Sequence, residues 1–202
     1  MEKLKVVFLI VVGGLVLLAL FQSFILANKD KTEEQKYSLI RKYNDFEIRF
    51  YPPANLATIS SNAKSYSDLS GPGFRKLAGY IFGGNEGNKN IAMTAPVQMD
   101  INDTASSMSF VMPSNYSLAD LPKPNDQSVR ISKTAEEYAA VITFNGYASD
   151  KEIKLYSEKL DSLLQVNNIK HLGNFRFYGY DPPYKPINRR NEIVVTVDWQ
   201  GK

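Results

Sequence analysis

The chain has 202 residues, of which 44% are hydrophobic, so it is long enough for one ordinary domain with a short extension. Its 24 Lys and Arg residues nearly balance its 21 Asp and Glu residues, and the formal charge is only +3. This balance argues against a nucleic-acid partner, because such proteins carry a clustered basic surface. The absence of cysteine excludes disulfides, thiolate metal sites and a cysteine nucleophile.

The first segment of the chain is almost uninterruptedly apolar from Val6 to Ala27. A helix of this length, at about 1.5 Å per residue, matches the roughly 30 Å hydrocarbon core of a membrane. Lys3 and Lys5 precede it, which predicts a cytoplasmic N-terminus and a domain across the membrane. We therefore expect residues 1–27 to form a single-pass transmembrane anchor, with a cleaved signal peptide as the alternative. Either predicts a domain outside the cytoplasm, periplasmic or extracellular.

Residues 28–36 are polar and charged without apolar periodicity, which predicts a solvated linker before a domain over residues 37–202. The domain opens with three short β-type runs, and its many aromatic, Val and Ile residues favour a β-rich fold. The runs are residues 38–43, 46–51 and 54–60.

A short amphipathic helix follows, since apolar residues recur at the spacing of one helical face. These residues are Phe74, Leu77, Ala78, Ile81 and Phe82. Because Gly71-Pro72-Gly73 directly precedes them, we expect the helix to be cut short at its start. Strands are expected over residues 91–100 and 108–112.

The second half repeats this order, with strands at residues 129–132 and 138–145, a helix from Asp150, and strands at residues 175–180 and 192–199. Ser149 and Glu152 form a capping box at the start of that helix. The sequence therefore predicts an α+β domain of about nine strands and two helices with an internal pseudo-two-fold repeat. We expect its sheet to be closed, or nearly closed, because closure hides the edges.

Reactive chemistry is scarce in this sequence. His171 is the only histidine, and no Gly-x-Ser-x-Gly motif accompanies it, which argues against a serine hydrolase. The His and Cys ligands of a usual zinc site are missing as well. An aromatic-rich domain without catalytic groups suits the binding of a flat apolar ligand better than bond breaking.

Four segments in this order resemble the SOUL haem-binding family: FRKLAGYIFGGN (74–85), IAMTAPV (91–97), FVMPSNY (110–116) and GYDPPYKPINRRNEI (179–193). The resemblance covers roughly residues 37–199. It implies a distorted antiparallel β-barrel with two flanking helices and an internal repeat. It also implies binding of haem or another porphyrin in an open apolar groove beside the first helix.

By that resemblance, one set of residues lies under the macrocycle, a second walls the groove, and a third meets the propionates. The three sets are Phe74, Leu77, Ala78 and Ile81; Val129, Tyr178 and Tyr184; and Lys185, Arg189 and Arg190. The residues themselves leave a structural alternative open for each set. The helix residues can belong to the core, and the arginines can hold Glu192 or a strand end.

Three functions remain open at this point. The first is a tetrapyrrole carrier or buffer. The second is a haem-modifying enzyme, which requires a titratable group such as His171, Tyr178 or Tyr184 facing the ring. The third is an effector-binding module with a different ligand. The resemblance and the lack of catalytic groups favour the first, with no metal ligand expected from the protein and His171 expected at the surface.

Overall fold

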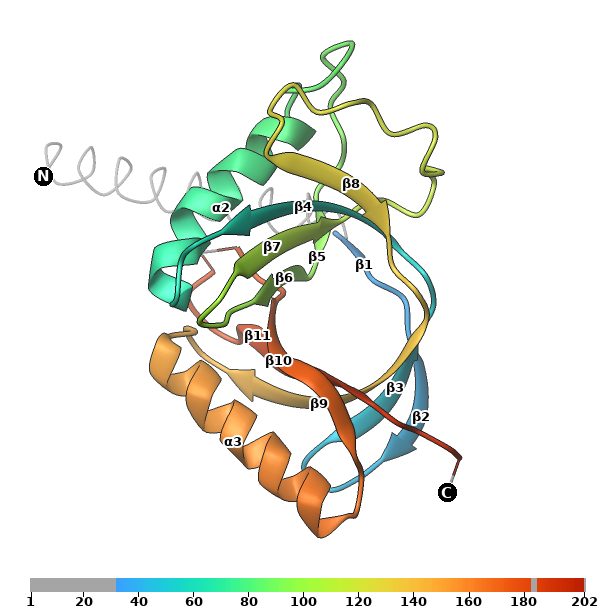
Figure 1. Cartoon of the computed structure of the whole chain (residues 1–202), viewed down its shortest axis with the longest axis vertical. Helices are drawn as coiled ribbons and strands as arrows, with labels where there is room; N and C mark the ends of the chain where they lie inside the picture. The colour runs from blue at the N-terminus through green and yellow to red at the C-terminus, as the bar shows by residue number, and fades with distance from the viewer. Residues whose placement is uncertain (1–31, 183–184, 202) are drawn as a thin grey trace, which may run out of the picture. The chain divides into compact units, whose positions relative to one another are not determined.

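The computed structural model describes residues 32–182 and 185–201 of the chain (Figure 1). The predicted anchor at residues 1–27 lies outside this part, and so does Tyr184. Across the described residues, no helix combines the length and the apolar character that a membrane crossing requires.

Nine strands of the described residues form one sheet, in which all neighbouring strands are antiparallel. They are β2 (Ser38–Lys42), β3 (Glu47–Tyr51), β4 (Asn55–Ser61), β6 (Val97–Asp100), β7 (Ser106–Val111), β8 (Val129–Lys133), β9 (Glu137–Asn145), β10 (His171–Gly179) and β11 (Arg190–Val197). Two helices, α2 (Tyr66–Ile81) and α3 (Asp150–Val166), pack against this sheet. A separate parallel pair joins β1 (Glu33–Glu34) to β5 (Thr94–Ala95).

The strand order is β2-β3-β9-β11-β10-β6-β7-β4-β8, and apart from the additional edge strand β2 it is symmetric about the β10–β6 pair. One half of the chain runs β4-α2-β6-β7 and the other runs β9-α3-β10-β11. The outer strands are exchanged, because β3 precedes β4 in the chain but pairs with β9, while β8 precedes β9 but pairs with β4. The two halves thus repeat one order of strands and helix, and the exchange of β3 and β8 joins them.

The prediction of a closed barrel is wrong, because the sheet curls but keeps β2 and β8 as two free edges (Figure 1). Both edges are protected by other means. All five residues of β2 are exposed, it carries an irregularity between Leu39 and Arg41, and it ends on Lys42. The other edge exposes Arg130 and Lys133 on β8. Exposed charges and bulges discourage edge-to-edge pairing, so closure is not needed.

Helix α2 begins eight residues earlier than the sequence predicted and runs through Pro72. Its N-cap is Ser65, whose side chain accepts a hydrogen bond from the backbone N–H of Asp68 at 3.1 Å. Pro72 lies on the exposed side of the helix. Gly73 faces the sheet, where a Cβ atom would lie 3.0 Å from Met108 Cε, so the glycine allows α2 to approach β7 closely. The predicted capping box of α3 is confirmed, since Ser149 and Glu152 are hydrogen-bonded to each other.

The two faces of the sheet differ because successive side chains of a strand point to opposite sides. The face under both helices holds the main core, which includes Ile142 of β9, Phe177 of β10 and Ile193 of β11. The opposite face carries a smaller apolar cluster around Tyr51 and Tyr178. Polar and charged side chains surround that second cluster.

The end of the predicted linker belongs to the folded unit. Glu33 accepts a hydrogen bond from the backbone N–H of Ser114 at 3.0 Å, and the backbone N–H of Gln35 donates to the carbonyl of Ala95 at 2.8 Å. Glu34 forms an ion pair with Arg190 at 2.9 Å. Residues 33–36 therefore form a strap across the domain, which we call the N-terminal strap.

Candidate functional site

One flank of α2 presents apolar and small residues that are not fully covered. Phe74, Ala78 and Phe82 recur at intervals of four and therefore lie in one row along the helix. Phe74 packs edge-on against Phe110, with ring centroids 5.3 Å apart, and is half-buried like Ala78. Phe82 is 62% exposed. With Gly71 one turn before Phe74, these residues form what we call the α2 flank.

The α2 flank faces away from the sheet edge at β8. On the other side of the helix, Lys76 donates a hydrogen bond to Ser128 beside β8 at 3.2 Å. Helical geometry places the row of Phe74 and Ala78 on the side opposite to Lys76, across the buried face of α2. The flank is therefore directed away from the β8 edge and toward β7, where Phe74 contacts Phe110.

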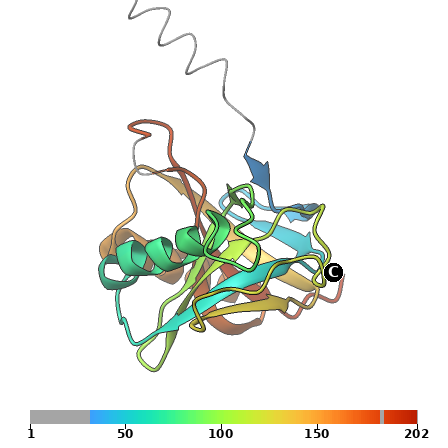
Figure 2. The same ribbon diagram turned by 90° about the horizontal axis from the view of Figure 1, so that it is seen from above.

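The loop between β10 and β11 lies at the start of α2 (Figure 2). Burial raises the pKa of Tyr66 in the first turn of α2, and the charge of nearby Arg189 acts against that rise. The first turn is also tied to α3, because the carboxylate of Asp150 accepts hydrogen bonds from the backbone N–H groups of Tyr66 and Ser67, at 2.5 and 3.3 Å. The β10–β11 loop and the starts of both helices thus meet at one end of the α2 flank.

The β10–β11 loop is held by its own charged side chains. Arg189 is only 8% exposed, and its guanidinium donates to the carbonyls of Asp181, Pro182 and Lys185 at 3.2, 2.6 and 3.1 Å. Burial works to raise the pKa of Asp181, but hydrogen bonds from Lys185 and from the backbone N–H of Arg190 hold it below its usual range. The described residues of the loop are therefore held in place by hydrogen bonds and an ion pair within the loop itself.

A buried charge network lies beyond the loop, on the sheet face opposite to the helices. Glu192 is 0% exposed, and its carboxylate accepts hydrogen bonds from Arg49 at 3.0 Å, from Arg190 at 2.8 Å and from the Tyr180 hydroxyl at 2.8 Å. Burial alone would lower the pKa of Arg49, but Glu192 raises it well above its ordinary value. The Arg49 guanidinium therefore stays charged, and the network joins β3 to β11 and to Tyr180 just after β10.

The structure separates the predicted site residues into groups. Leu77 is 0% exposed and Ile81 is also in the core, which is the structural alternative given for the helix residues. Val129 is buried in the same core. Phe74 and Ala78 remain at the surface on the α2 flank. Tyr178 is buried on the opposite sheet face, away from this set. Tyr184 lies outside the described residues.

The predicted propionate partners already have contacts within the protein. Lys185 pairs with Asp181 at 2.5 Å, and Arg189 is committed to the three loop carbonyls. Arg190 forms an ion pair with Glu192, which is the structural alternative given for it in the sequence analysis. Phe82 was not among the predicted site residues. The signal was present in the sequence, because Phe82 follows Phe74 by eight residues and therefore lies in the same row of the helix.

His171 begins β10 and lies against α3. Its Nε2 atom is 3.3 Å from Asp161, its ring lies 5.0 Å from that of Phe175, and its Nδ1 atom is buried. Within the residues that the structure describes, no three His, Asp or Glu side chains gather at one point as a metal site requires. The α2 flank thus offers partly exposed apolar side chains, and His171 lies elsewhere, beside Asp161 of α3.

Solved structures share the fold. The C-terminal domain of EcmrR has a TM-score of 0.55 and 12% identity, and the match covers 81% of this chain and 99% of that one. An uncharacterized conserved protein from Listeria innocua has a TM-score of 0.57 and 10% identity, with coverages of 76% and 92%. At these identities the likeness extends to the fold alone.

Sequence comparison identifies closer relatives. "Heme-binding protein 1" of Xenopus laevis is 31% identical over 155 residues, which cover 73% of this chain and 81% of that protein. "Heme-binding protein 2" of Homo sapiens is 31% identical over 157 residues, with coverages of 73% and 76%. Residues 32–196 match the family described as SOUL heme-binding protein. The identity, the coverage and the family match agree, and the chain belongs to the SOUL heme-binding protein family.

Proposed function

We propose that this protein binds haem or another porphyrin on the α2 flank and acts as a carrier or buffer of that ligand. The observation that carries the proposal is the half-open apolar row of Phe74, Ala78 and Phe82 in a chain of this family. The faces of a porphyrin macrocycle are apolar, so partly exposed apolar side chains can be buried against them. The names of the relatives support a tetrapyrrole as the ligand.

Binding on this flank does not depend on His171. Its Nδ1 atom is buried and its Nε2 atom faces Asp161, so neither nitrogen is free to approach an iron atom at α2. Metal-free protoporphyrin IX is therefore expected to bind about as tightly as haemin. Lys185 is the cation that a propionate meets most easily, because only a partly exposed ion pair with Asp181 has to open.

The test is a titration of the protein with haemin and with protoporphyrin IX, followed by absorbance and by quenching of Trp199. Ala78→Glu places a carboxylate in the apolar row and should weaken both ligands by at least about tenfold, because the charge loses solvation under the ring. Gly79→Glu is the matched control, since a side chain at Gly79 meets no atom within 4 Å. Equal affinity of the two variants would remove the α2 flank as the site.

The protein is proposed to bind the tetrapyrrole without altering it. The enzyme alternative needs a titratable group facing the ring, but Tyr178 is buried on the opposite sheet face and burial raises its pKa well above the usual range. The absorbance spectrum of bound haem should therefore persist for hours with a reductant and oxygen present. Loss of the haem band with release of free iron or of a ring-opened product contradicts a binding role.

We further propose that residues 1–27 hold the protein in a membrane, with the domain outside the cytoplasm. The support is the apolar run from Val6 to Ala27 behind Lys3 and Lys5. The full chain should stay with membranes during alkaline extraction, and protease added to the outer side of that membrane should digest the domain. Release by alkali, or protection from the protease, contradicts this arrangement.

A further inference from the structure

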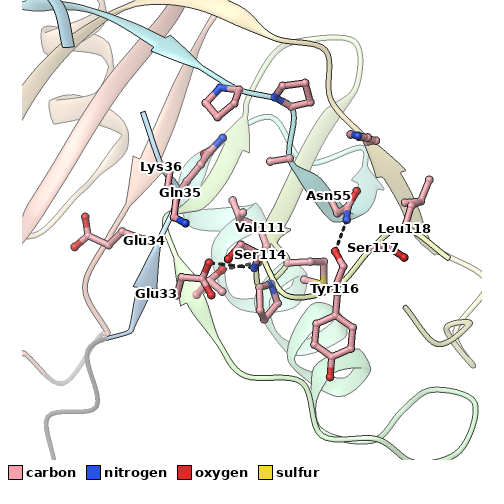
Figure 3. Close-up of a pocket in the computed structure, with 17 residues that line it drawn as sticks. Glu33, Glu34, Gln35, Lys36, Asn55, Val111, Ser114, Tyr116, Ser117 and Leu118 are labelled. Atoms are coloured by element: carbon pink, nitrogen blue, oxygen red, sulfur yellow. Dashed lines mark hydrogen bonds between the residues drawn. The ribbon is translucent and has the colours of Figure 1, made fainter. Parts of the chain in front are cut away.

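A cleft of about 330 Å³ lies within the folded unit, apart from the α2 flank. It opens where β4 begins and β7 ends, and the N-terminal strap forms one of its walls (Figure 3). None of its 17 lining residues belongs to α2, α3 or the β10–β11 loop. The cleft is therefore a separate feature of the molecule.

Much of the cleft wall is apolar. Val111, Met112 and Pro113 are buried at the end of β7, and Pro52 and Pro53 lie before β4. The opposite wall is fixed in place, because Glu33 of the strap binds the backbone of Ser114. A preformed apolar cleft favours binding because little order has to be created when a ligand enters.

The acidic side chains that line the cleft already have partners, whereas the basic ones have none among the described residues. Its two carboxylates are engaged, with Glu33 on the backbone N–H of Ser114 and Glu34 on Arg190. Lys36 and Lys133 line the cleft too, and among residues 32–182 and 185–201 neither ammonium has a hydrogen-bond or ion-pair partner. The free charge at the cleft is thus positive.

We propose that this cleft is a second binding site, which takes a small organic anion with an apolar body, such as an aryl or short-chain carboxylate. The anion meets Lys36 and Lys133, while its apolar part lies against Val111 and Pro52. The volume lies at the lower end of the roughly 300–1,000 Å³ that small-molecule sites occupy, which suits a ligand smaller than a tetrapyrrole.

The test uses the full chain in non-ionic detergent and 4-fluorophenylacetate as the probe, with fluorine NMR line broadening as the readout and a detergent-only blank. Saturable one-site binding is expected. The double variant Lys36→Gln/Lys133→Gln should weaken it by about tenfold, a change of about 1.4 kcal/mol. The matched control is Lys42→Gln/Lys64→Gln, which removes two exposed lysines outside the cleft and should leave the affinity unchanged.

Two further comparisons complete the test. The first asks whether the probe binds in the cleft or on the α2 flank, and the second asks whether binding depends on the charge of the probe or only on its shape. Ala78→Glu should bind the probe like the unmodified chain, and the neutral 4-fluorophenylacetamide should bind more weakly than the carboxylate. No saturation by the carboxylate, equal affinity in the cleft double variant, or loss of binding in Ala78→Glu would each overturn the proposal. None of these results bears on whether a porphyrin binds.

Discussion

Glu192 joins two arginines in a place that water does not reach. Its substitution by Gln leaves Glu47 as the ion-pair partner of Arg49 and Glu34 as that of Arg190 among the described residues. Removing one partner of a buried ion pair typically costs about 3–5 kcal/mol, so we expect Glu192→Gln to lower the free energy of unfolding by about 3 kcal/mol. Urea unfolding followed by circular dichroism measures this change.

The matched control is Glu47→Gln, which acts on the same Arg49 from a more exposed position. Since partly exposed ion pairs contribute little, its cost should stay below about 1 kcal/mol. Equal costs for the two substitutions would mean that the burial of Glu192 does not set its contribution.

Tyr51 makes the stability of the domain sensitive to alkali. Burial raises its pKa to about 12, although the charge of Arg49 acts to lower it. In the unfolded chain Tyr ionises near pH 10, so the unfolded state loses its proton first and the stability falls as the pH rises from 10 toward 12. Tyr51→Phe should therefore lose about 1–2 kcal/mol less over this interval, at about 1.4 kcal/mol for each pKa unit. Urea unfolding at pH 9 and pH 11.5 tests this, and parallel losses in both proteins contradict it.

The sequence alone could not show whether Lys185 and Arg189 are free to bind a ligand. The resemblance pointed to Lys185 and Arg189 as ligand-binding cations, and their charge is all that the sequence displays. Their partners are the carboxylate of Asp181 and three loop carbonyls, which the fold of the β10–β11 loop brings into reach. Whether a cation is free depends on that loop geometry, so it could not be predicted from residue type.

Two glycines of helix α2 differ in the space around them, since Gly79 is open and Gly73 is crowded. A Cβ atom added at Gly79 would meet no atom within 4 Å, so Gly79→Ala should stabilise the domain by about 0.5–1 kcal/mol through helix propensity alone. Gly73→Ala gains the same propensity, but its Cβ would lie 3.0 Å from Met108 Cε and 3.3 Å from Ile59 Cδ1. We expect it to be less stable than Gly79→Ala by at least about 1 kcal/mol.

Thermal and urea unfolding of both glycine variants check this expectation. Circular dichroism should show the same helix content in each, because neither change interrupts α2. Equal stability of the two variants would show that the close approach of α2 to β7 is not limited by Gly73.

The elements themselves were largely predictable, and the exception has a physical cause. Alternating and helical spacing located α3 and most strands, and the Ser149 capping box marked the start of α3 correctly. For α2, Gly71-Pro72-Gly73 favoured a later start than the N-cap at Ser65 that the structure shows. A proline is tolerated there because it lies on the exposed side of the helix, and the packing of Leu69 and Leu77 on the sheet offsets its cost.

At the scale of the molecule, the N-terminal strap ties distant parts of the domain together. It contacts Ser114, Ala95 and Arg190, and Gln98 donates to the Gln35 side chain at 2.7 Å. A chain that begins at Thr32 should therefore be more stable to urea than one that begins at Tyr37, by about 1–3 kcal/mol, because several partly buried hydrogen bonds are retained. Identical unfolding midpoints of the two chains would mean that the N-terminal strap does not stabilise the domain.

The repeated order of strands and helices could be predicted from the sequence, but the pairing of the strands in the sheet could not. Two rounds of strands, helix and strands are visible in the order of the sequence. The exchange of β3 and β8 between the halves, and the open edges that result, depend on contacts between residues far apart in the chain. The cleft was not predicted for the same reason, since its walls come from five separate stretches, around Glu33, Pro52, Thr94, Val111 and Lys133.

Hydrogen–deuterium exchange of the full chain in detergent, with and without protoporphyrin IX, tests directly whether the α2 flank binds the macrocycle. If the macrocycle lies on the α2 flank, the amides of residues 71–82 should exchange more slowly in the complex, with smaller effects at residues 185–189. The Lys36 and Val111 segments should be unaffected. Unchanged exchange along α2, or protection confined to the cleft, would contradict the proposed site.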